Sequence, residues 1–442
     1  MNQPHSVDLI VYAKWIIPVI PSNTVLTNYS VIINRGAIIA IKPASEASSH
    51  YTATTEKYLS NHVLMPGLVN AHGHVATSLL RGYADDLPLQ SWLEDHIWPT
   101  EAQHVNDTFV KQGAELAIAE MIRTGTTCFS DMYLFPDQTA TVAHHAGMRC
   151  QIAFPIVEFP SAWANDADEY ISKGLALRDT YRSHDLINVV FGPHSPYTIG
   201  DATFKRIATL ASEIQSPVHI HLHETADEVN TAIEKSGMRP IERLHKLGVL
   251  TSSTQCVHMT QVADEDITLL QQSGAHIIHC PESNLKLASG FCPINKLLDA
   301  GINVALGTDG AASNNNLDLF GEMHTATLLG KAIANNATTP NAHQALEMAT
   351  INGAKCMGMD EYIGSLETGK IADMIAIELD PLEQAPLHDI ASAIVYTHNG
   401  HRVTHSWVNG KMLMDNREIL ALNTGEIISN AKHWQESLSK PT

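Results

Sequence analysis

The feature that most constrains the fold is a series of eight short apolar runs in the middle of the chain. They are residues 67–75, 126–131, 149–154, 188–194, 217–224, 254–259, 276–281 and 303–310. Most of the intervals between them have helical periodicity, with Asp201 as a predicted N-cap and Gly274 as a predicted helix end. Eight strand-then-helix units within ~250 residues predict an α/β fold, a (β/α)8 TIM-like barrel.

The two ends of the chain are rich in β-strand patterns instead. Residues 8–20 and 29–41 are strand-like, with a turn at 34–36, and 371–379, 392–398 and 405–414 resemble them. Asn399-Gly400 and Asn409-Gly410 are hairpin signals. We therefore predict a β-sandwich domain built from 1–65 and 370–442, which includes a closing helix over 424–440, and a barrel domain over 66–369.

Charge and cysteine usage exclude several classes of protein. The 442 residues include 27 Lys plus Arg and 47 Asp plus Glu, a net charge of −20, which argues against nucleic-acid or membrane-surface partners. The six cysteines form no C-x-x-C pair, which favours reduced thiols. No apolar stretch approaches ~18 residues and the first residues lack a secretory pattern, so we expect a cytoplasmic protein.

Five of the eight runs end in His, Asp or Glu, and barrel strands end at one common mouth. His72 and His74 have the i, i+2 spacing that places two side chains on one face of a strand. His219, His221 and His223 share that alternation. One of the three suffices as a metal ligand, and the others could line the barrel or hydrogen-bond to a metal-binding side chain on its side away from the metal.

Asp309 lies between small residues in GTDG at the end of the eighth run. Imidazoles together with this carboxylate suit one divalent ion of the zinc class. Such an ion lowers the pKa of bound water from ~15.7 towards ~7. Glu224 and His258 are the candidate proton carriers, and Asp309 could accept the proton of the attacking water.

Five longer motifs resemble the amidohydrolase superfamily, and within it the branch of 5′-methylthioadenosine/S-adenosylhomocysteine deaminases and related chlorohydrolases. The motifs are PGLVNAHGH, GPHSPY, HLHET, HCPESNLKL and LGTDGAASNNNLDLFGEM, and the resemblance covers nearly the whole chain. It implies a β-sandwich from both termini beside the barrel and one Zn²⁺ per chain, with Fe²⁺ or Mn²⁺ as alternatives. The fourth run has His194 and no lysine, so a two-metal site is not indicated.

The resemblance also implies roles for single residues. The metal ligands are His72, His74, His221 and Asp309. The catalytic residues are Glu224, His258 and Asp309. The substrate-binding residues are Glu101 for the ribose hydroxyls, His194, Trp163, and again Glu224 and Asp309.

The sixth run allows two alignments with the family motif. Without a gap, His258 takes the place of the catalytic histidine and Gln261 replaces a second one; matching the letters CVH instead puts Gln255 in the catalytic place. We prefer His258, because the distance to HCPESN is then preserved.

Residues after the third run decide the expected substrate. Homologues that accept the homocysteine derivative have arginines there, whereas this chain has Phe154, Phe159 and Trp163 and no arginine over 150–166. An apolar wall suits a thiomethyl group better than a carboxylate, although these aromatics could simply pack the barrel rim.

We therefore predict zinc-dependent hydrolytic deamination of an adenine nucleoside. The expected substrate is 5′-methylthioadenosine, with S-adenosylhomocysteine or adenosine as further ones. The alternatives are a deaminase or chlorohydrolase acting on guanine, a pterin or a triazine, and, remotely, a non-catalytic scaffold. Expected partners are the small-molecule nucleoside and other copies of the chain, in a homo-oligomer (a dimer or tetramer), with no nucleic acid and no membrane.

Overall fold

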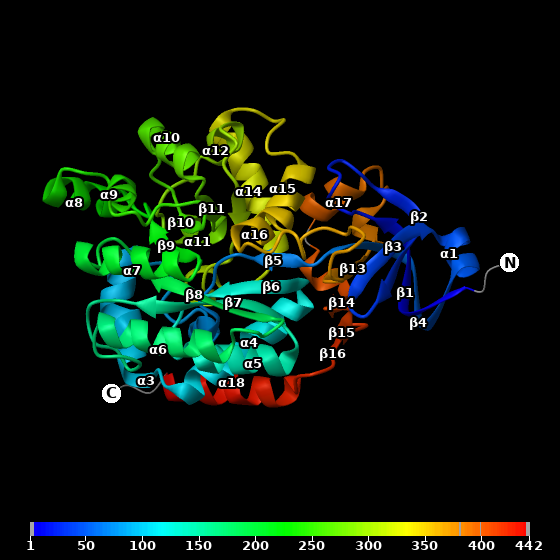
Figure 1. The fold of residues 1–442 in the computed structure, drawn as a ribbon, viewed down its shortest axis with the longest axis horizontal. Helices are drawn as coiled ribbons and strands as arrows, with labels where there is room; N and C mark the ends of the chain where they lie inside the picture. The colour runs from blue at the N-terminus through cyan, green and yellow to red at the C-terminus, as the bar shows by residue number, and fades with distance from the viewer. Residues whose placement is uncertain (1–3, 380–381, 398, 439–442) are drawn as a thin grey trace.

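A computed structural model of the protein describes residues 4–379, 382–397 and 399–438. The strands form two sheets of eight, a parallel one from the middle of the chain and a separate one from both ends. Figure 1 shows the parallel sheet, wrapped by helices, on the left and the terminal sheet on the right.

The parallel sheet is the predicted barrel, and each apolar run supplies one of its strands. The strands are β5 (Leu68–Asn70), β6 (Thr126–Asp131), β7 (Arg149–Ile156), β8 (Ile187–Pro193), β9 (Val218–Leu222), β10 (Thr254–His258), β11 (His276–His279) and β12 (Val304–Leu306). They pair in chain order. The barrel closes where the Ala71 N–H donates to the Leu306 carbonyl at 2.9 Å. The predicted fold class is confirmed.

Helices alternate with these strands. Between β5 and β9 they are η1 (Val75–Leu80), α2 (Leu89–Ser91), η2 (Trp92–Ile97), α3 (Trp98–His104), α4 (Asp107–Arg123), α5 (Pro136–Ala146), α6 (Ala167–Thr180) and α7 (Asp201–Glu213). After β9 they are α8 (Ala226–Ser236), α9 (Pro240–Lys246), α10 (Asp264–Ser273), α11 (Pro281–Lys286), α12 (Ile294–Asp299), α13 (Ala311–Asn314), α14 (Leu319–Ala334), α15 (Ala342–Met348) and α16 (Ile351–Cys356). Among the described residues, no helix has both the length and the apolar character needed to cross a bilayer.

The second sheet joins the two ends of the chain. Its strands are β1 (His5–Ile16), β2 (Leu26–Asn34), β3 (Ala37–Pro43), β4 (Tyr51–Pro66), β13 (Met374–Glu378), β14 (Val403–Val408), β15 (Lys411–Asp415) and β16 (Glu418–Ile419), with α1 (Ala44–His50) before β4. The central pairing is β13 with β4, so each terminus supplies one half. Asn409 and Gly410 both have positive φ, 51° and 69°, and form the predicted hairpin turn.

Three local predictions are wrong. Residues 392–396 lie in a helix, α17 (Ile390–Tyr396), because Asp389 caps it by accepting the Ser392 N–H at 2.6 Å and Ala391, Ile394 and Val395 share its buried face. Asn399-Gly400 is followed by a 3₁₀ turn, η4 (Gly400–Arg402), instead of forming a hairpin; a second such turn is η3 (Leu382–Gln384). The N-cap of α7 is Gly200, because the Asp201 carboxylate pairs with Arg243 instead. Residues 398 and 439–440 of the predicted elements lie outside the described residues.

The closing helix, α18 (Thr424–Leu438), packs on the barrel. The Trp434 indole meets the Phe109 ring edge-on at 5.0 Å, and its N–H donates to the Gln112 side chain at 2.7 Å. In Figure 1 it runs along the lower edge of the barrel, beside α4.

Candidate active site

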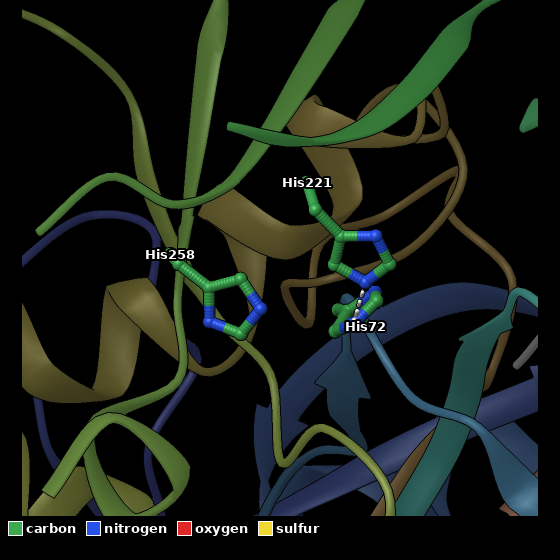
Figure 2. Close-up of side chains that lie close together, drawn as sticks. All are labelled: His72, His221 and His258. Atoms are coloured by element: carbon green, nitrogen blue, oxygen red, sulfur yellow. Dashed lines mark hydrogen bonds between the residues drawn. The ribbon is translucent and has the colours of Figure 1, made fainter. Parts of the chain in front are cut away.

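Four of the predicted ligands converge at the mouth of the barrel. Asp309 Oδ1 lies 3.3 Å from His72 Nε2 and 3.2 Å from His74 Nε2, and the Nε2 atoms of His72 and His221 are 3.3 Å apart. Figure 2 shows His72 and His221 facing each other across this gap. Two ligands of a tetrahedral zinc ion, each about 2.0–2.1 Å from it, lie about 3.3 Å apart, so the spacing fits one such ion.

Two of the three imidazoles, those of His74 and His221, point their ring protons away from this centre. His74 Nδ1 lies 2.5 Å from the Met132 carbonyl, and His221 Nδ1 lies 2.8 Å from the His194 carbonyl. A carbonyl can only accept, so both rings carry their proton on Nδ1 and turn the Nε2 lone pair to the centre. Nitrogen lone pairs that converge beside a carboxylate suit a cation bound between them, and this set of donor atoms is one that zinc prefers.

Hydrogen bonds hold one oxygen of the Asp309 carboxylate, and the other oxygen faces His72 and His74. Its Oδ2 accepts hydrogen bonds from the hydroxyls of Ser283 at 2.6 Å and Ser313 at 2.8 Å. Burial alone would raise the pKa of Asp309, but contacts with His72 and His74 outweigh burial and hold this pKa well below its usual range. The carboxylate is therefore ionised at neutral pH.

His258 ends β10 and also faces the centre. His258, His72 and His221 form a second set of three side chains that could hold a metal ion, and Figure 2 shows their rings together. His258 Nδ1 lies 2.9 Å from the Asn284 side-chain oxygen, which leaves Nε2 directed at Glu224 Oε2, 3.9 Å away. Gln255, the residue of the alternative alignment, is fully buried inside the barrel.

Glu224 lines the same cavity, and the side chain of Glu228 holds its backbone N–H. The Glu228 carboxylate accepts the N–H groups of His223 at 3.0 Å and Glu224 at 2.8 Å. Burial raises the pKa of Glu224, so the carboxyl gives up its proton less readily than it would in water. Sequence reasoning missed Asn284, although it lies in the motif HCPESNLKL, and Glu228, which lies three residues after the motif HLHET.

A cavity of about 780 Å³ opens from this centre. Glu101 lies on its wall and accepts a hydrogen bond from the Tyr133 hydroxyl at 2.5 Å. Burial raises the pKa of Glu101. His194 also lines the cavity; burial lowers its pKa to about 4, so the ring is neutral. Of the described residues that line the cavity, none is a lysine or an arginine.

The structure does not bring Trp163 or Phe154 to this cavity. The Ser161 hydroxyl accepts the Trp163 N–H at 3.0 Å, and in this turn the indole packs against Tyr170, at 5.6 Å between ring centres. Phe154 is fully buried beside Phe191. Phe159 does line the cavity and is half-exposed.

Part of the remaining apolar wall comes from a segment that sequence reasoning passed over. Leu89, Trp92, Leu93, Ile97 and Trp98 line the cavity from α2, η2 and α3. The signal was present as a dense apolar pattern between the first two strands, LPLQSWLEDHIW.

The three histidines of β9 do not share one face. His219 and His221 point into the barrel, but His223 follows the strand with φ 53° and turns away. There its Nδ1 lies 3.0 Å from the Gln261 carbonyl and its Nε2 accepts the Ile241 N–H at 3.2 Å. The alternation fails because the strand ends at Leu222.

Comparisons with known proteins agree with this geometry. Residues 63–413 match the model of the amidohydrolase family. The chain is 53% identical to proteins of Teredinibacter turnerae (99% of each chain) and Saccharophagus degradans (98% of each), both named 5-methylthioadenosine/S-adenosylhomocysteine deaminase. A crystal structure of an adenosine deaminase from Xanthomonas campestris with bound zinc superposes with a TM-score of 0.98, at 43% identity over 99% of each chain. An atrazine chlorohydrolase from Arthrobacter aurescens, 23% identical with a TM-score of 0.90 over 96% of this chain and 99% of its own, shares the fold.

Proposed function

The chain belongs to the amidohydrolase family, and on that premise we propose that it is a zinc-dependent deaminase of adenine nucleosides whose preferred substrate is 5′-methylthioadenosine. One observation carries the proposal: a single cavity joins the metal-binding centre to Glu101 and then to an apolar wall without a cationic side chain. The relatives named above support the choice of nucleoside.

His72, His74, His221 and Asp309 would hold the ion. When bound, it supplies the Lewis acid that makes water nucleophilic at neutral pH. The oxygen of that water adds to the amino-bearing carbon of the purine, and the carbon–nitrogen bond breaks to give the hypoxanthine base and ammonia.

Protein side chains move the protons. Glu224 donates a proton from its carboxyl to the ring nitrogen beside the reacting carbon, so that negative charge does not build up on the ring. Asp309 accepts one proton of the attacking water and passes it to the departing amine, and the other proton of the water replaces the one that Glu224 gave to the ring. His258, oriented by Asn284, positions the water with Nε2.

The far end of the cavity selects the nucleoside. The Glu101 carboxylate accepts hydrogen bonds from the two ribose hydroxyls, and Tyr133 holds it in place. The apolar wall then receives the thiomethyl group. The amino-acid carboxylate of S-adenosylhomocysteine finds no cation there, and burying an unpaired charge costs several kcal/mol. We therefore expect S-adenosylhomocysteine to be a poorer substrate than 5′-methylthioadenosine.

The direct test is ammonia release from a panel of substrates by zinc-loaded protein. We expect kcat/KM for 5′-methylthioadenosine to exceed that for S-adenosylhomocysteine by at least about tenfold, the equivalent of about 1.4 kcal/mol. Turnover of guanine or a pterin with no turnover of any adenine nucleoside would overturn the substrate assignment.

A second prediction concerns the ribose contact. Replacing Glu101 with Gln removes the charged acceptor, so KM for every adenine nucleoside should rise about tenfold or more, because hydrogen bonds to charged groups contribute about 1.5–3 kcal/mol. Glu115→Gln, a substitution on α4 away from the cavity, serves as the control. An unchanged KM in Glu101→Gln would favour a substrate without ribose.

The protein's surroundings follow from the same chemistry. All six cysteines are buried and free, which supports a reducing compartment such as the cytoplasm. The homo-oligomer expected from the family resemblance stays a prediction.

A further inference from the structure

We propose that His219 is a positioning residue which, together with Gln255, fixes the proton of the ligand His72 on Nδ1 and so presents its Nε2 lone pair to the ion. His219 does not reach the ion's position itself; it acts through His72, with 2.8 Å between its Nε2 and His72 Nδ1. This inference rests on the proposed metal site but not on the proposed substrate.

His72 needs such a device because its partner differs from those of the other two ligands. The Nδ1 atoms of His74 and His221 face backbone carbonyls, which can only accept a proton. His72 faces another imidazole, and a neutral imidazole offers a donor on one nitrogen and an acceptor on the other. If His219 turned a donor to it, His72 would carry its proton on Nε2, where the ion must bind.

A backbone carbonyl at the far end of a hydrogen-bond chain settles the direction. The chain runs from the Cys356 carbonyl through Gln255 and His219 to His72. Cys356 is the last residue of α16, where carbonyls lack an intrahelical partner, and its oxygen lies 2.8 Å from Gln255 Nε2. Because that carbonyl only accepts, the amide nitrogen of Gln255 must face it. The amide oxygen of Gln255 then faces His219.

The next links follow without further choice. Gln255 Oε1 lies 2.6 Å from His219 Nδ1, so His219 carries its proton on Nδ1 and donates it to the amide oxygen. His219 Nε2 is thereby an acceptor, and His72 Nδ1 must supply the proton. The ring planes of His72 and His219 are 21° from parallel, with 5.0 Å between the ring centres.

A second glutamine locks the orientation of the first. Gln151 Nε2 donates to Gln255 Oε1 at 2.8 Å, and Gln255 Nε2 donates back to Gln151 Oε1 at 3.2 Å. The Ser130 hydroxyl accepts from Gln151 at 3.0 Å. His72, His219 and both glutamine side chains are fully buried, so water cannot replace a lost partner or relax the choice of tautomer.

The test measures zinc affinity by competition with a chelator, together with the visible absorption spectrum of the cobalt-loaded protein. Gln255→Met keeps every imidazole and removes the oxygen that orients His219. We expect it to weaken zinc binding about 10- to 100-fold and to change the cobalt spectrum. Gln384→Met is the matched control, because Gln384 is a buried glutamine bonded to Asn399 at 2.6 Å outside the barrel. It should leave both readouts unchanged.

Two substitutions at His219 separate positioning from packing. His219→Leu should weaken zinc binding as Gln255→Met does, and the double variant should be no weaker than His219→Leu, because both changes break one chain. His219→Gln retains an acceptor for His72 and should keep most of the affinity. Wild-type zinc affinity in folded Gln255→Met, or a His219→Gln protein as weak as His219→Leu, would overturn the proposal. If His219→Leu does not fold, the zinc affinity of Gln255→Met, compared with the wild type and with Gln384→Met, still decides. Zinc affinity does not depend on which nucleoside is turned over, so failure here is distinguishable from a wrong substrate.

Discussion

At the scale of single residues, the site is built where strands end in unusual backbone conformations. His223, His258 and Asp309 have φ of 53°, 74° and 60°, a region that non-glycine residues enter at a cost of order 1–3 kcal/mol. Each lies at or just after the end of a barrel strand. The strain redirects side chains: it turns His223 out of the barrel while His258 and Asp309 line the cavity at its mouth.

Glu224→Gln tests the proposed proton donor. The amide keeps the shape of the side chain but has no acidic proton to give, so kcat should fall by about 10²- to 10⁴-fold. Zinc content, measured by metal analysis, should stay at one ion per chain because Glu224 is not a ligand. Glu242→Gln on the exposed face of α9 is the control, and a Glu224→Gln enzyme with wild-type kcat would remove Glu224 from the mechanism.

Sequence reasoning predicted which polar strand ends lie together, because they all belong to one barrel mouth; their role as metal ligands stays a prediction. The polar ends at His72, His221 and Asp309 do meet, as strands of one barrel require. It could not predict where the Trp163 side chain points. The Trp163 N–H donates to the Ser161 hydroxyl in a turn that directs the indole inward, and a side-chain hydrogen bond of this kind cannot be read from the sequence. Sequence reasoning left the role of His219 open, because that role depends on Gln255 and Cys356, which come together only in the folded barrel.

At the scale of elements, apolar runs identify strands only where nothing competes. Each of the eight barrel strands coincides with its predicted apolar run, because the surrounding elements bury both faces of the parallel sheet. The predicted strand at 392–398 is also apolar, yet its residues 392–396 form the helix α17, whose N-cap is Asp389. A cap is worth about 1 kcal/mol, and for so short a segment it can decide between helix and strand.

One close contact between elements supports the metal centre directly. Helix α4 packs on η1, which begins immediately after His74, and Gly113 is the point of approach. A Cβ at Gly113 would lie 2.4 Å from the Ala76 carbonyl oxygen and 2.8 Å from its Cα. Only glycine lets the two backbones come this close, so α4 sets the position of the segment that carries His74.

Gly113→Ala should therefore damage stability and metal binding together. Overpacking of this kind costs about 1–3 kcal/mol, which urea unfolding measures, and displacement of η1 should weaken zinc binding. The control is Gly425→Ala in α18, where the nearest atom to a new Cβ is 3.5 Å away. Loss of stability with unchanged zinc affinity would show that His74 is positioned independently of α4.

At the scale of the whole molecule, a buried ion pair ties the barrel to the chain returning to the terminal sheet. Arg149, the first residue of β7, donates from Nε to Asp373 Oδ2 at 2.7 Å and from Nη2 to Oδ1 at 3.2 Å. The two side chains are only 6% and 2% exposed. Asp373 also accepts the Asn409 N–H at 2.7 Å, in the hairpin turn of the sheet. The pair lies at the start of a barrel strand, opposite the mouth.

Arg149→Met should destabilise the fold without changing the chemistry. It leaves the Asp373 carboxylate buried without its cation, which costs about 3–5 kcal/mol of unfolding free energy in urea. Adding Asp373→Asn should recover a large part of the loss, because the amide oxygen still accepts the Asn409 N–H and no charge remains. Arg206→Met, which breaks an exposed pair with Asp168, is the control and should leave stability unchanged. Zinc affinity and kcat of the folded fraction should match the wild type, because the mouth lies at the other end of the strands. If the second substitution makes the first worse, the pair stabilises the fold by attraction rather than by avoiding a stranded charge.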